Sequence, residues 1–335
     1  MGTRILAGAF ALPAFLLIGH AAEAPKPPLG MPPILWPKDN PYSAAKAELG
    51  RYLYFDRRLS ADETLSCASC HAPQLGFTDG RAVSLGIKAQ RGGRSAPTVI
   101  NRVYSMAQFW DGRAASLEEQ AKGPIANPIE MGMTHEGVVE RIRGVAGYRP
   151  LFAKAFGSEA IDMDRMAKAI ACFERTVLSG NAPYDRYRAG NKKAMSPAQV
   201  RGMNVFVNKA KCDQCHEGAN FTLNSYHNLG VGADKPEPDT GRYEVTKDSR
   251  DWGAFKTPTL REIEHTAPYM HDGSLKTLED VVEYYNRGGT PNRNLDPAIK
   301  PLHLTEQDKR DLVAFMKALS GEGWQQIKEP PEFPK

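Results

Sequence analysis

Two short stretches decide the fold of this chain: CASCH at residues 67–71 and CDQCH at residues 212–216. Each places two cysteines three positions apart, with a histidine directly after the second cysteine. This spacing attaches a c-type haem, because two thiols on one turn form thioethers with the vinyl groups and the adjacent imidazole ligates iron. A thioredoxin-like dithiol or half of a zinc site would explain one such stretch, but two copies favour haem.

The two stretches therefore predict two covalently bound c-type haems, with His71 and His216 as the proximal iron ligands. The predicted attachment residues are Cys67, Cys70 and His71 for the first haem and Cys212, Cys215 and His216 for the second. The fifth cysteine, Cys172, lies in an apolar helical pattern. We expect it to be a buried, inert thiol rather than a redox group.

Length and composition set the general class. The chain has 335 residues, which suggests two domains rather than one small module. Hydrophobic residues make up 41% and charged residues 24%, which excludes a membrane-embedded or wholly disordered chain. The formal net charge of +4 is too small to indicate a nucleic-acid binder.

The N-terminus has the pattern of a cleaved secretory leader. Arg4 supplies a positive start, residues 5–18 are apolar but short for a membrane span, and Ala22-Glu23-Ala24 provides the small residues of a cleavage site. An uncleaved membrane anchor is the other interpretation. The leader predicts a periplasmic protein that does not span the membrane after cleavage, and haem attachment of this type also occurs outside the cytoplasm.

Helical spacing dominates the rest of the chain. We expect helices over residues 43–54, 163–178, 196–205 and 305–319, the last two capped by Ser196 and by Thr305 with Asp308. The predicted fold is all-α, with two cytochrome c-like domains that each carry one covalent haem and meet at an interdomain interface. The expected divisions are a signal peptide (1–24), a proline-rich extended segment with seven prolines (25–41), an N-terminal domain (42–192) and a C-terminal domain (193–335).

An internal repeat supports the interpretation as two units. A constant shift that places Pro97 on Pro258 aligns the two halves without a gap as far as Pro124. The attachment stretches are separated by a smaller shift, so the loop after Cys215 is longer than its counterpart in the first half. In the register of the repeat Pro124 coincides with Tyr285. Proline has no side-chain donor but a tyrosine phenolate ligates iron, so we expect an open first haem and a second haem closed by Tyr285.

Other residues compete with Tyr285 for the second iron. Met270 is a rival ligand, but its counterpart in the repeat is the apolar Phe109, which favours a core role for Met270. His227, His265 and His271 are further candidates. A core role for Tyr285 itself is the remaining interpretation.

Taken together, the sequence resembles the bacterial dihaem cytochrome c peroxidase and MauG superfamily from about Asn40 to Gly323. The motifs that carry the resemblance are the two attachment stretches, FWDGR at 109–113, the run 120–131, FERT at 173–176 and APYMHDG at 267–273.

The resemblance implies roles for several residues. Gln120, Pro124 and Glu130 match the distal residues over the peroxidatic haem, with Glu130 as the proton shuttle for O–O cleavage. Trp110 matches the tryptophan that relays electrons or holes between the haems. The interdomain calcium site of the family is matched by Asn101, Thr266 and Pro268, which implies one bound Ca²⁺.

Two departures from the family's peroxidases matter. Those enzymes place a methionine where this chain has Tyr285, and they carry a histidine in the loop after the first attachment stretch, whereas residues 72–95 contain none. The resemblance then implies a high-spin first haem that is open without reductive activation and a low-spin second haem. It also points to the MauG-like branch, where peroxide drives the haems to a high-valent state that oxidises a partner's side chain.

We therefore expect an H₂O₂-dependent dihaem oxidoreductase that oxidises an aromatic residue, a tryptophan, of an exported partner protein. MauG has a surface tryptophan where this chain has Ala210, so Trp252 or Trp324 would have to provide the exit route. One alternative is a cytochrome c peroxidase with a small cytochrome c or cupredoxin as donor. The other is a dihaem electron carrier without catalysis.

Overall fold

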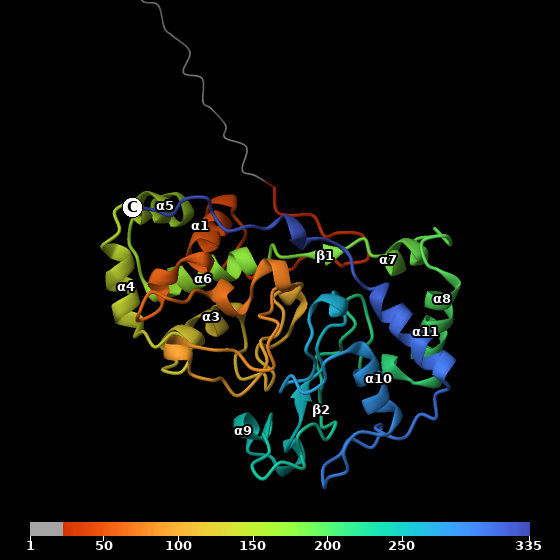
Figure 1. The fold of residues 1–335 in the computed structure, drawn as a ribbon. Helices are drawn as coiled ribbons and strands as arrows, with labels where there is room; N and C mark the ends of the chain where they lie inside the picture. The colour runs from red at the N-terminus through yellow and green to blue at the C-terminus, as the bar shows by residue number, and fades with distance from the viewer. Residues whose placement is uncertain (1–22) are drawn as a thin grey trace, which may run out of the picture.

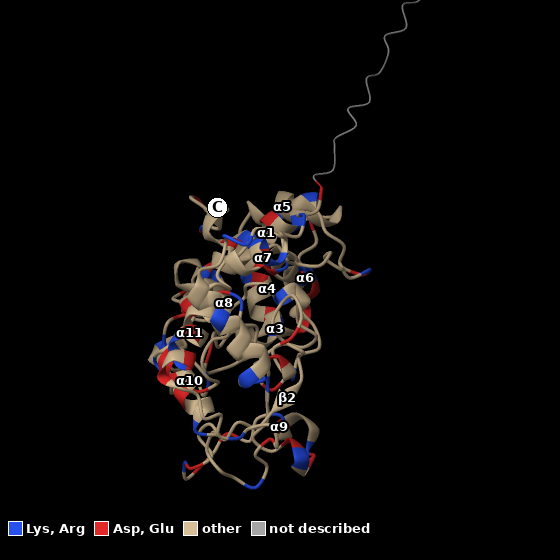
Figure 2. Cartoon of the chain, turned by 90° about the vertical axis from the view of Figure 1, so that its right-hand side faces the viewer, with Lys and Arg blue, Asp and Glu red and all other residues tan. Residues whose placement is uncertain are grey.

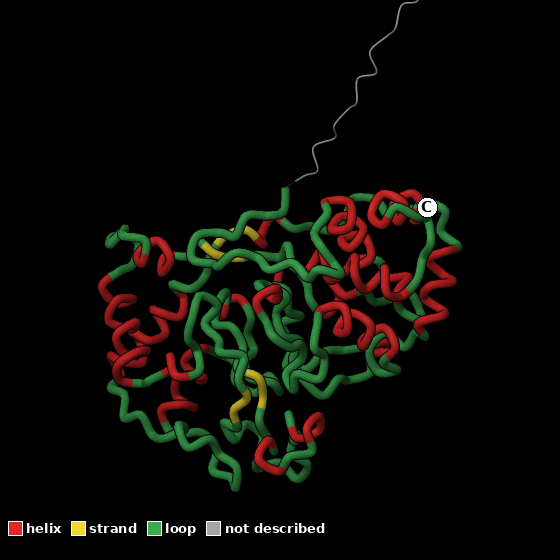
Figure 3. The backbone as a smooth tube through the Cα atoms, turned by 180° about the vertical axis from the view of Figure 1, so that it is seen from behind, coloured by secondary structure: helices red, strands yellow, loops and turns green. Residues whose placement is uncertain are grey.

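The structure is a computed structural model that describes residues 23–335, so the predicted signal peptide lies almost wholly outside the described residues. Helices gather at the two sides of the molecule, and long loops fill the middle between them (Figures 1 and 3). The helices of the first half are α1 (Ala44–Phe55), α2 (Cys67–Cys70), α3 (Leu117–Ala126), α4 (His135–Arg143), α5 (Tyr148–Phe156) and α6 (Met163–Glu174).

The second half has fewer long helices and more loop. Its helices are α7 (Pro183–Arg188), α8 (Pro197–Asn204), α9 (Tyr243–Thr246), α10 (Leu278–Asn286) and α11 (Glu306–Lys317). The strands form two antiparallel pairs of two residues each: β1 (Ser179–Gly180) with β4 (Glu322–Gly323), and β2 (Tyr226–His227) with β3 (Phe255–Lys256). The all-α fold class is thereby confirmed.

The predicted helix starts are confirmed by their caps. The side chain of Ser43 accepts a hydrogen bond from the backbone N–H of Lys46 at the start of α1, and Thr305 forms a capping box with Asp308 at the start of α11. The helix predicted over 163–178 ends at Glu174 instead. The reason is a long-range pairing, because the carbonyl of Val177 accepts from the N–H of Asn101 and the next residues form β1.

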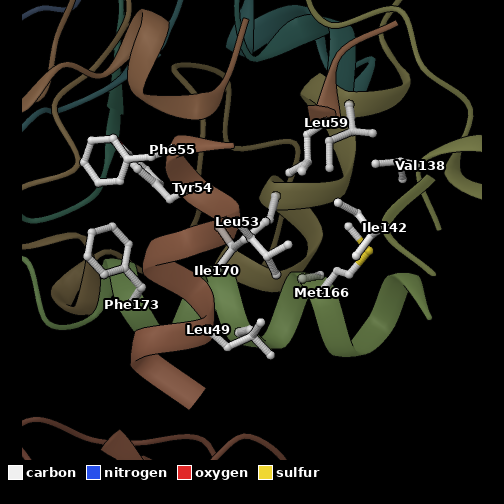
Figure 4. Packing of buried hydrophobic residues seen from close by; sticks show 14 of the residues in the cluster. Leu49, Leu53, Tyr54, Phe55, Leu59, Val138, Ile142, Met166, Ile170 and Phe173 are labelled. Carbon is white, nitrogen blue, oxygen red and sulfur yellow. The ribbon is translucent and has the colours of Figure 1, made fainter. Parts of the chain in front are cut away.

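Each half of the chain has a hydrophobic cluster that packs its helices together. In the first, Leu49 and Leu53 of α1 pack with Met166 and Ile170 of α6 (Figure 4). In the second, α8 and α11 meet around three aromatic rings, Phe206, Phe221 and Phe315, whose centroids are 5.2–6.3 Å apart. The boundary expected at 192/193 stays a prediction, but the structure places Tyr184 and Tyr187 of α7 against the second cluster.

The repeat is visible in the backbone. The isolated bridge between Gln108 and Ala114 recurs between Tyr269 and Leu275, which are their counterparts in the register of the repeat. Helix α3 follows the first bridge and α10 follows the second, with their first residues in the same register. The two units therefore present the same turn and the same helix to their cavities.

Two extended segments run over the first unit. In the proline-rich segment, the carbonyl of Leu29 accepts from Asn181, and the side chain of Asn40 donates to Glu118. The C-terminal tail returns beside α5 (Figure 1), where the carbonyl of Lys335 accepts from the N–H of Gly147. Basic and acidic residues are interspersed over the face in Figure 2, and within residues 23–335 no helix is long and apolar enough to span a bilayer.

A glycine sits at the closest approach of the main helices in each unit. A Cβ built on Gly50 of α1 would lie 1.9 Å from the carbonyl oxygen of Ala169 in α6, and one on Gly202 of α8 would lie 1.8 Å from that of Asp311 in α11. Both contacts are with backbone atoms, which cannot move aside as a side chain does. The two crossings therefore require glycine.

We predict that Gly202→Ala lowers the free energy of unfolding by about 1–3 kcal/mol, the usual cost of forcing atoms into a packed region. Chemical denaturation of the haem-loaded protein, followed by circular dichroism, measures the change. Gly123→Ala is the control, because this glycine also lies in a helix, it lines neither cavity, and the same methyl group there would be 3.5 Å from its nearest neighbour, the Phe109 ring. Equal stability of Gly202→Ala and the unchanged protein would contradict the close crossing.

Candidate haem sites

The first attachment stretch forms one short helical turn. Cys67 and Cys70 are the first and last residues of α2, and His71 directly follows it. The Nδ1 atom of His71 lies 3.3 Å from the carbonyl oxygen of Phe77, an acceptor, so Nδ1 carries the proton and Nε2 keeps its lone pair. Burial lowers the pKa of His71, which keeps the imidazole neutral. The turn thus presents two thiols and one metal-binding nitrogen.

A cavity of about 560 Å³ lies beside this turn. It is lined by both cysteines and His71 and by all four predicted catalytic residues: Trp110, Gln120, Pro124 and Glu130. Gln120 and Pro124 belong to α3, and Glu130 lies in the turn after it. The loop 72–95 contributes Ser84, Gly86, Gly92, Gly93, Arg94 and Ser95, none of which is an ordinary iron ligand.

Glu130 occupies an environment suited to proton transfer. Burial raises the pKa of its carboxyl, while the Asn127 side chain and the nearby Arg113 act in the opposite direction. The Asn127 amide donates to Oε1 of Glu130 over 2.8 Å, which fixes the orientation of the carboxyl. The guanidinium of Arg113 lies 3.6 Å from the centre of the Phe109 ring and pairs with Asp111. The group is therefore oriented and partly desolvated at the cavity wall.

The second attachment stretch repeats the arrangement of the first. The Nδ1 atom of His216 lies 3.1 Å from the carbonyl oxygen of Phe221, and burial lowers the pKa of His216 to about 4. Cys212, Cys215 and His216 line a cavity of about 230 Å³, together with Tyr285 of α10. Burial raises the pKa of the Tyr285 phenol, so without a nearby cation it stays protonated.

Only some of the rival ligands lie at the second cavity. Met270, His227 and His271 also line the second cavity, whereas His265 is partly exposed and packs 5.7 Å from the Trp324 ring. His271 stacks on Phe255 with ring centres 3.6 Å apart. The ring nitrogens of His227 contact Ser225 and Asp296, at 2.8 and 2.6 Å. Both histidine rings thus have contacts with other side chains. Met270 lines the second cavity, and its counterpart Phe109 lines the first.

Trp110 lies in the wall between the two cavities, because it lines both of them. Its indole N–H donates to the carbonyl of Ser95 over 2.9 Å, and its own carbonyl accepts from the N–H of Lys256 over 2.7 Å. Residues of both halves therefore hold Trp110 between the two cavities.

The three predicted calcium ligands are brought together only in part. Thr266 and Pro268 line the second cavity. Asn101 is fully buried, and its side-chain amide both donates to the carbonyl and accepts from the N–H of Ser179, at 3.0 and 2.9 Å. The amide of Asn101 therefore pairs with the backbone of Ser179, the first residue of β1.

Both cavities fit a covalently attached haem. Each combines two unpaired thiols with a histidine whose outer nitrogen is oriented by a main-chain carbonyl, which is the donor set that attachment requires. Sequence reasoning missed other wall residues, namely Arg94, Arg102, Arg113, Asn127, Glu174, Glu244 and Lys256. Arg113 could have been predicted from the sequence, since it belongs to the FWDGR motif. Glu244 could not have been predicted, because α9 belongs to the longer loop of the second unit and reaches the first cavity only in the fold.

Comparisons with known proteins agree with this geometry. The sequence profile of a family described as di-haem cytochrome c peroxidase matches residues 44–193. The methylamine utilization protein MauG of Methylorubrum extorquens is 42% identical over 287 residues, which cover 85% of this chain and 81% of the relative. Cytochrome c551 peroxidase of Nitrosomonas europaea is 41% identical over 288 residues, which cover 84% and 82%. Cytochrome-c peroxidase IdrP1 of a Pseudomonas species is 39% identical and covers 92% and 89%.

Solved structures show the same likeness. A MauG-like protein associated with microbial copper homeostasis superposes with a TM-score of 0.81 at 34% identity, covering 95% of this chain and 97% of that one. The diheme peroxidase BthA of Burkholderia thailandensis shares the fold, with a TM-score of 0.72 at 22% identity, covering 87% and 89%. The chain therefore belongs to the family of dihaem cytochrome c peroxidases and MauG, and it is a dihaem peroxidase-type oxidoreductase.

Proposed function

We propose that this protein uses hydrogen peroxide to oxidise an aromatic side chain, a tryptophan, of an exported partner protein. The observation that carries the proposal is an asymmetry between equivalent positions: Tyr285 lines the second cavity with His216, whereas Pro124 lines the first cavity with His71. Relatives named MauG, at 42% and 39% identity, support this branch of the family.

The residues of the first cavity have separate tasks. A c-type haem held by His71 supplies peroxide binding and O–O bond cleavage. Pro124 contributes no donor atom to the cavity wall, and the amide of Gln120 would hold peroxide by hydrogen bonding. Glu130 takes a proton from one peroxide oxygen and returns it to the other, with its carboxyl oriented by Asn127.

The second cavity and the wall between the two have a different task. Tyr285 would hold the second haem together with His216, and its anionic oxygen would favour the oxidised state of iron where a methionine would favour the reduced state. Trp110 connects the two sites. For the exit to a partner, Trp252 is half-buried, whereas Trp324 is 6% exposed and lies within the first hydrophobic cluster. We therefore favour Trp252, since Ala210 takes the place of MauG's surface tryptophan.

The proposal includes a periplasmic location and one calcium ion. The location rests on the leader in residues 1–24 and on the family. The calcium ion rests on the resemblance, and its predicted ligands fit in part. The amide of Asn101 is committed to Ser179, so backbone oxygens of Thr266 and Pro268, together with water, would supply most of the ligands.

The electron source is tested with the exported protein encoded beside this gene. Mass spectrometry before and after treatment with peroxide and this enzyme should show a mass change confined to a tryptophan-containing peptide. Without enzyme, or with Glu130→Gln, the change should be absent or much slower. Rapid steady-state oxidation of a reduced small cytochrome c, with no change in the partner, would instead establish the peroxidase that the 41% identical cytochrome c551 peroxidase favours.

Tyr285→Phe should remove the sixth ligand of the second haem. Electron paramagnetic resonance of the resting ferric protein should then change from one high-spin and one low-spin signal to two high-spin signals. Tyr284→Phe is the matched control, because the neighbouring phenol donates to the carbonyl of Leu229 and is absent from the cavity wall. A low-spin signal that survives Tyr285→Phe unchanged would assign the ligand to another residue, with Met270 first.

Glu130→Gln should slow the reaction with peroxide by about 10²–10⁴-fold, the usual contribution of a positioned acid–base group. The carboxylate form accepts the first proton, so the rate should fall as the pH drops through the raised pKa of Glu130. The fall should begin at a higher pH than an ordinary glutamate would give, and it should be missing in the variant. Stopped-flow spectroscopy measures both. A variant rate within a factor of two would remove Glu130 from the mechanism.

A further inference from the structure

The two cavities share a wall, and their attachment residues lie away from it. Cys67 and Cys70 line only the first cavity, and Cys212 and Cys215 line only the second. A porphyrin carries its propionates on the edge remote from its vinyl groups, so cysteine attachment turns both propionate edges away from the thiols. The residues that line both cavities are Ser95, Ala96, Pro97, Thr98, Arg102 and Trp110.

Two buried cations lie at this wall. Arg102 is 9% exposed, and its guanidinium donates to the carbonyl of Thr98 over 2.8 Å and to the hydroxyl of Ser105 over 3.4 Å, which leaves Nη2 open to the cavities. Lys256 of β3 is 4% exposed and lines the second cavity. Across the described part of the chain, its Nζ has neither a hydrogen bond nor an ion pair. Burial, with a further contribution from Arg102, lowers the pKa of Lys256 to about 6.

The other buried lysine and arginine side chains within residues 23–335 have hydrogen-bonded partners. The ammonium of Lys46 donates to the side-chain oxygen of Asn40 and to the carbonyl of Pro41, and two arginines have carboxylate partners. Arg261 pairs with Asp185, and Arg175 pairs with Glu118, each over 2.6 Å. Glu174 is the carboxyl whose charge acts on Arg102. Burial raises the pKa of Glu174 to about 8, and no ion pair within 4 Å joins the two side chains in residues 23–335. Two neighbouring buried cations without an anion are costly. Without a partner Lys256 loses its proton, whereas an anion from outside the chain would let both side chains keep their charge.

We propose that Arg102 and Lys256 form one carboxylate-binding site where the cavities meet, and that the carboxylates are propionates of the two haems. Arg102 comes from the first unit and Lys256 from the second, so the haems themselves complete the charge balance of the interface. Because a cation stabilises the ferrous state over the ferric state, the pair also raises the reduction potential of both haems. This inference rests on haem binding alone and holds for either electron source.

The test is a redox titration of the haem-loaded protein, followed by optical and paramagnetic resonance spectra that resolve the two haems. Lys256→Gln should lower the reduction equilibrium constant of the second haem about tenfold, equivalent to about 59 mV for one electron. Arg102→Gln should lower both potentials, because Arg102 lines both cavities. Lys256→Arg should restore the potential, since it keeps the charge.

Lys317→Gln on α11 is the control for loss of one charge, because this side chain is exposed and lies outside both cavity walls. Resonance Raman spectroscopy provides a second readout, in which the propionate bending bands should shift in Lys256→Gln and in Arg102→Gln. If either glutamine variant fails to load haem, the Raman spectra of Lys256→Arg and of Arg102→Lys take its place. A shift of the propionate bending bands in these variants supports the contact, and unchanged bands contradict it. Unchanged potentials together with unchanged propionate bands would overturn the proposal.

Discussion

Each haem site depends on a histidine ring that is held from behind by the carbonyl of a buried phenylalanine. Phe77 and Phe221 both have positive φ, 58° and 51°, and this bend turns their carbonyl oxygens toward His71 and His216. Their side chains anchor the bend, since Phe77 is fully buried and Phe221 packs against Phe315. The direction of each iron ligand is therefore set by the hydrophobic core, and a core defect would misdirect the metal-binding nitrogen.

The repeat explains how one scaffold produces two unlike sites. Turn, bridge and helix recur at the same offset, so a substitution at one position of the helix is enough to place a proline at one cavity and a phenol at the other. The longer loop adds a further difference. It brings Glu244 of α9 to the wall of the first cavity. Arg94 of the first unit, which also pairs with Asp111, holds this loop by pairing with Asp239. The second unit thus helps to enclose the site of the first.

Features that depend on local spacing were predictable from the sequence. The attachment turns and the caps at Ser196 and Thr305 follow from neighbours along the chain, and the pairing of Pro124 with Tyr285 follows from the repeat. The roles of Gln120 and Glu130 came from the resemblance to the family. Features that depend on distant contacts were not. The helix after Met163 ends early because Val177 pairs with Asn101, and Asn101 binds Ser179. Nothing in the residues around Lys256 showed that it would be buried beside Arg102, because the two are far apart in sequence.

The return of the C-terminal segment to the first unit has a consequence for biogenesis. Trp324 packs against Phe77, and β4 pairs with β1, so the first core contains residues from the far end of the chain. On the export route that belongs to the proposed function, a polypeptide threaded through a pore from its amino end presents Cys67 and Cys70 long before Trp324 emerges. The cytochrome maturation machinery would therefore meet the first attachment turn while it is still loosely packed, and the arrival of the last residues would seal the loaded haem in place.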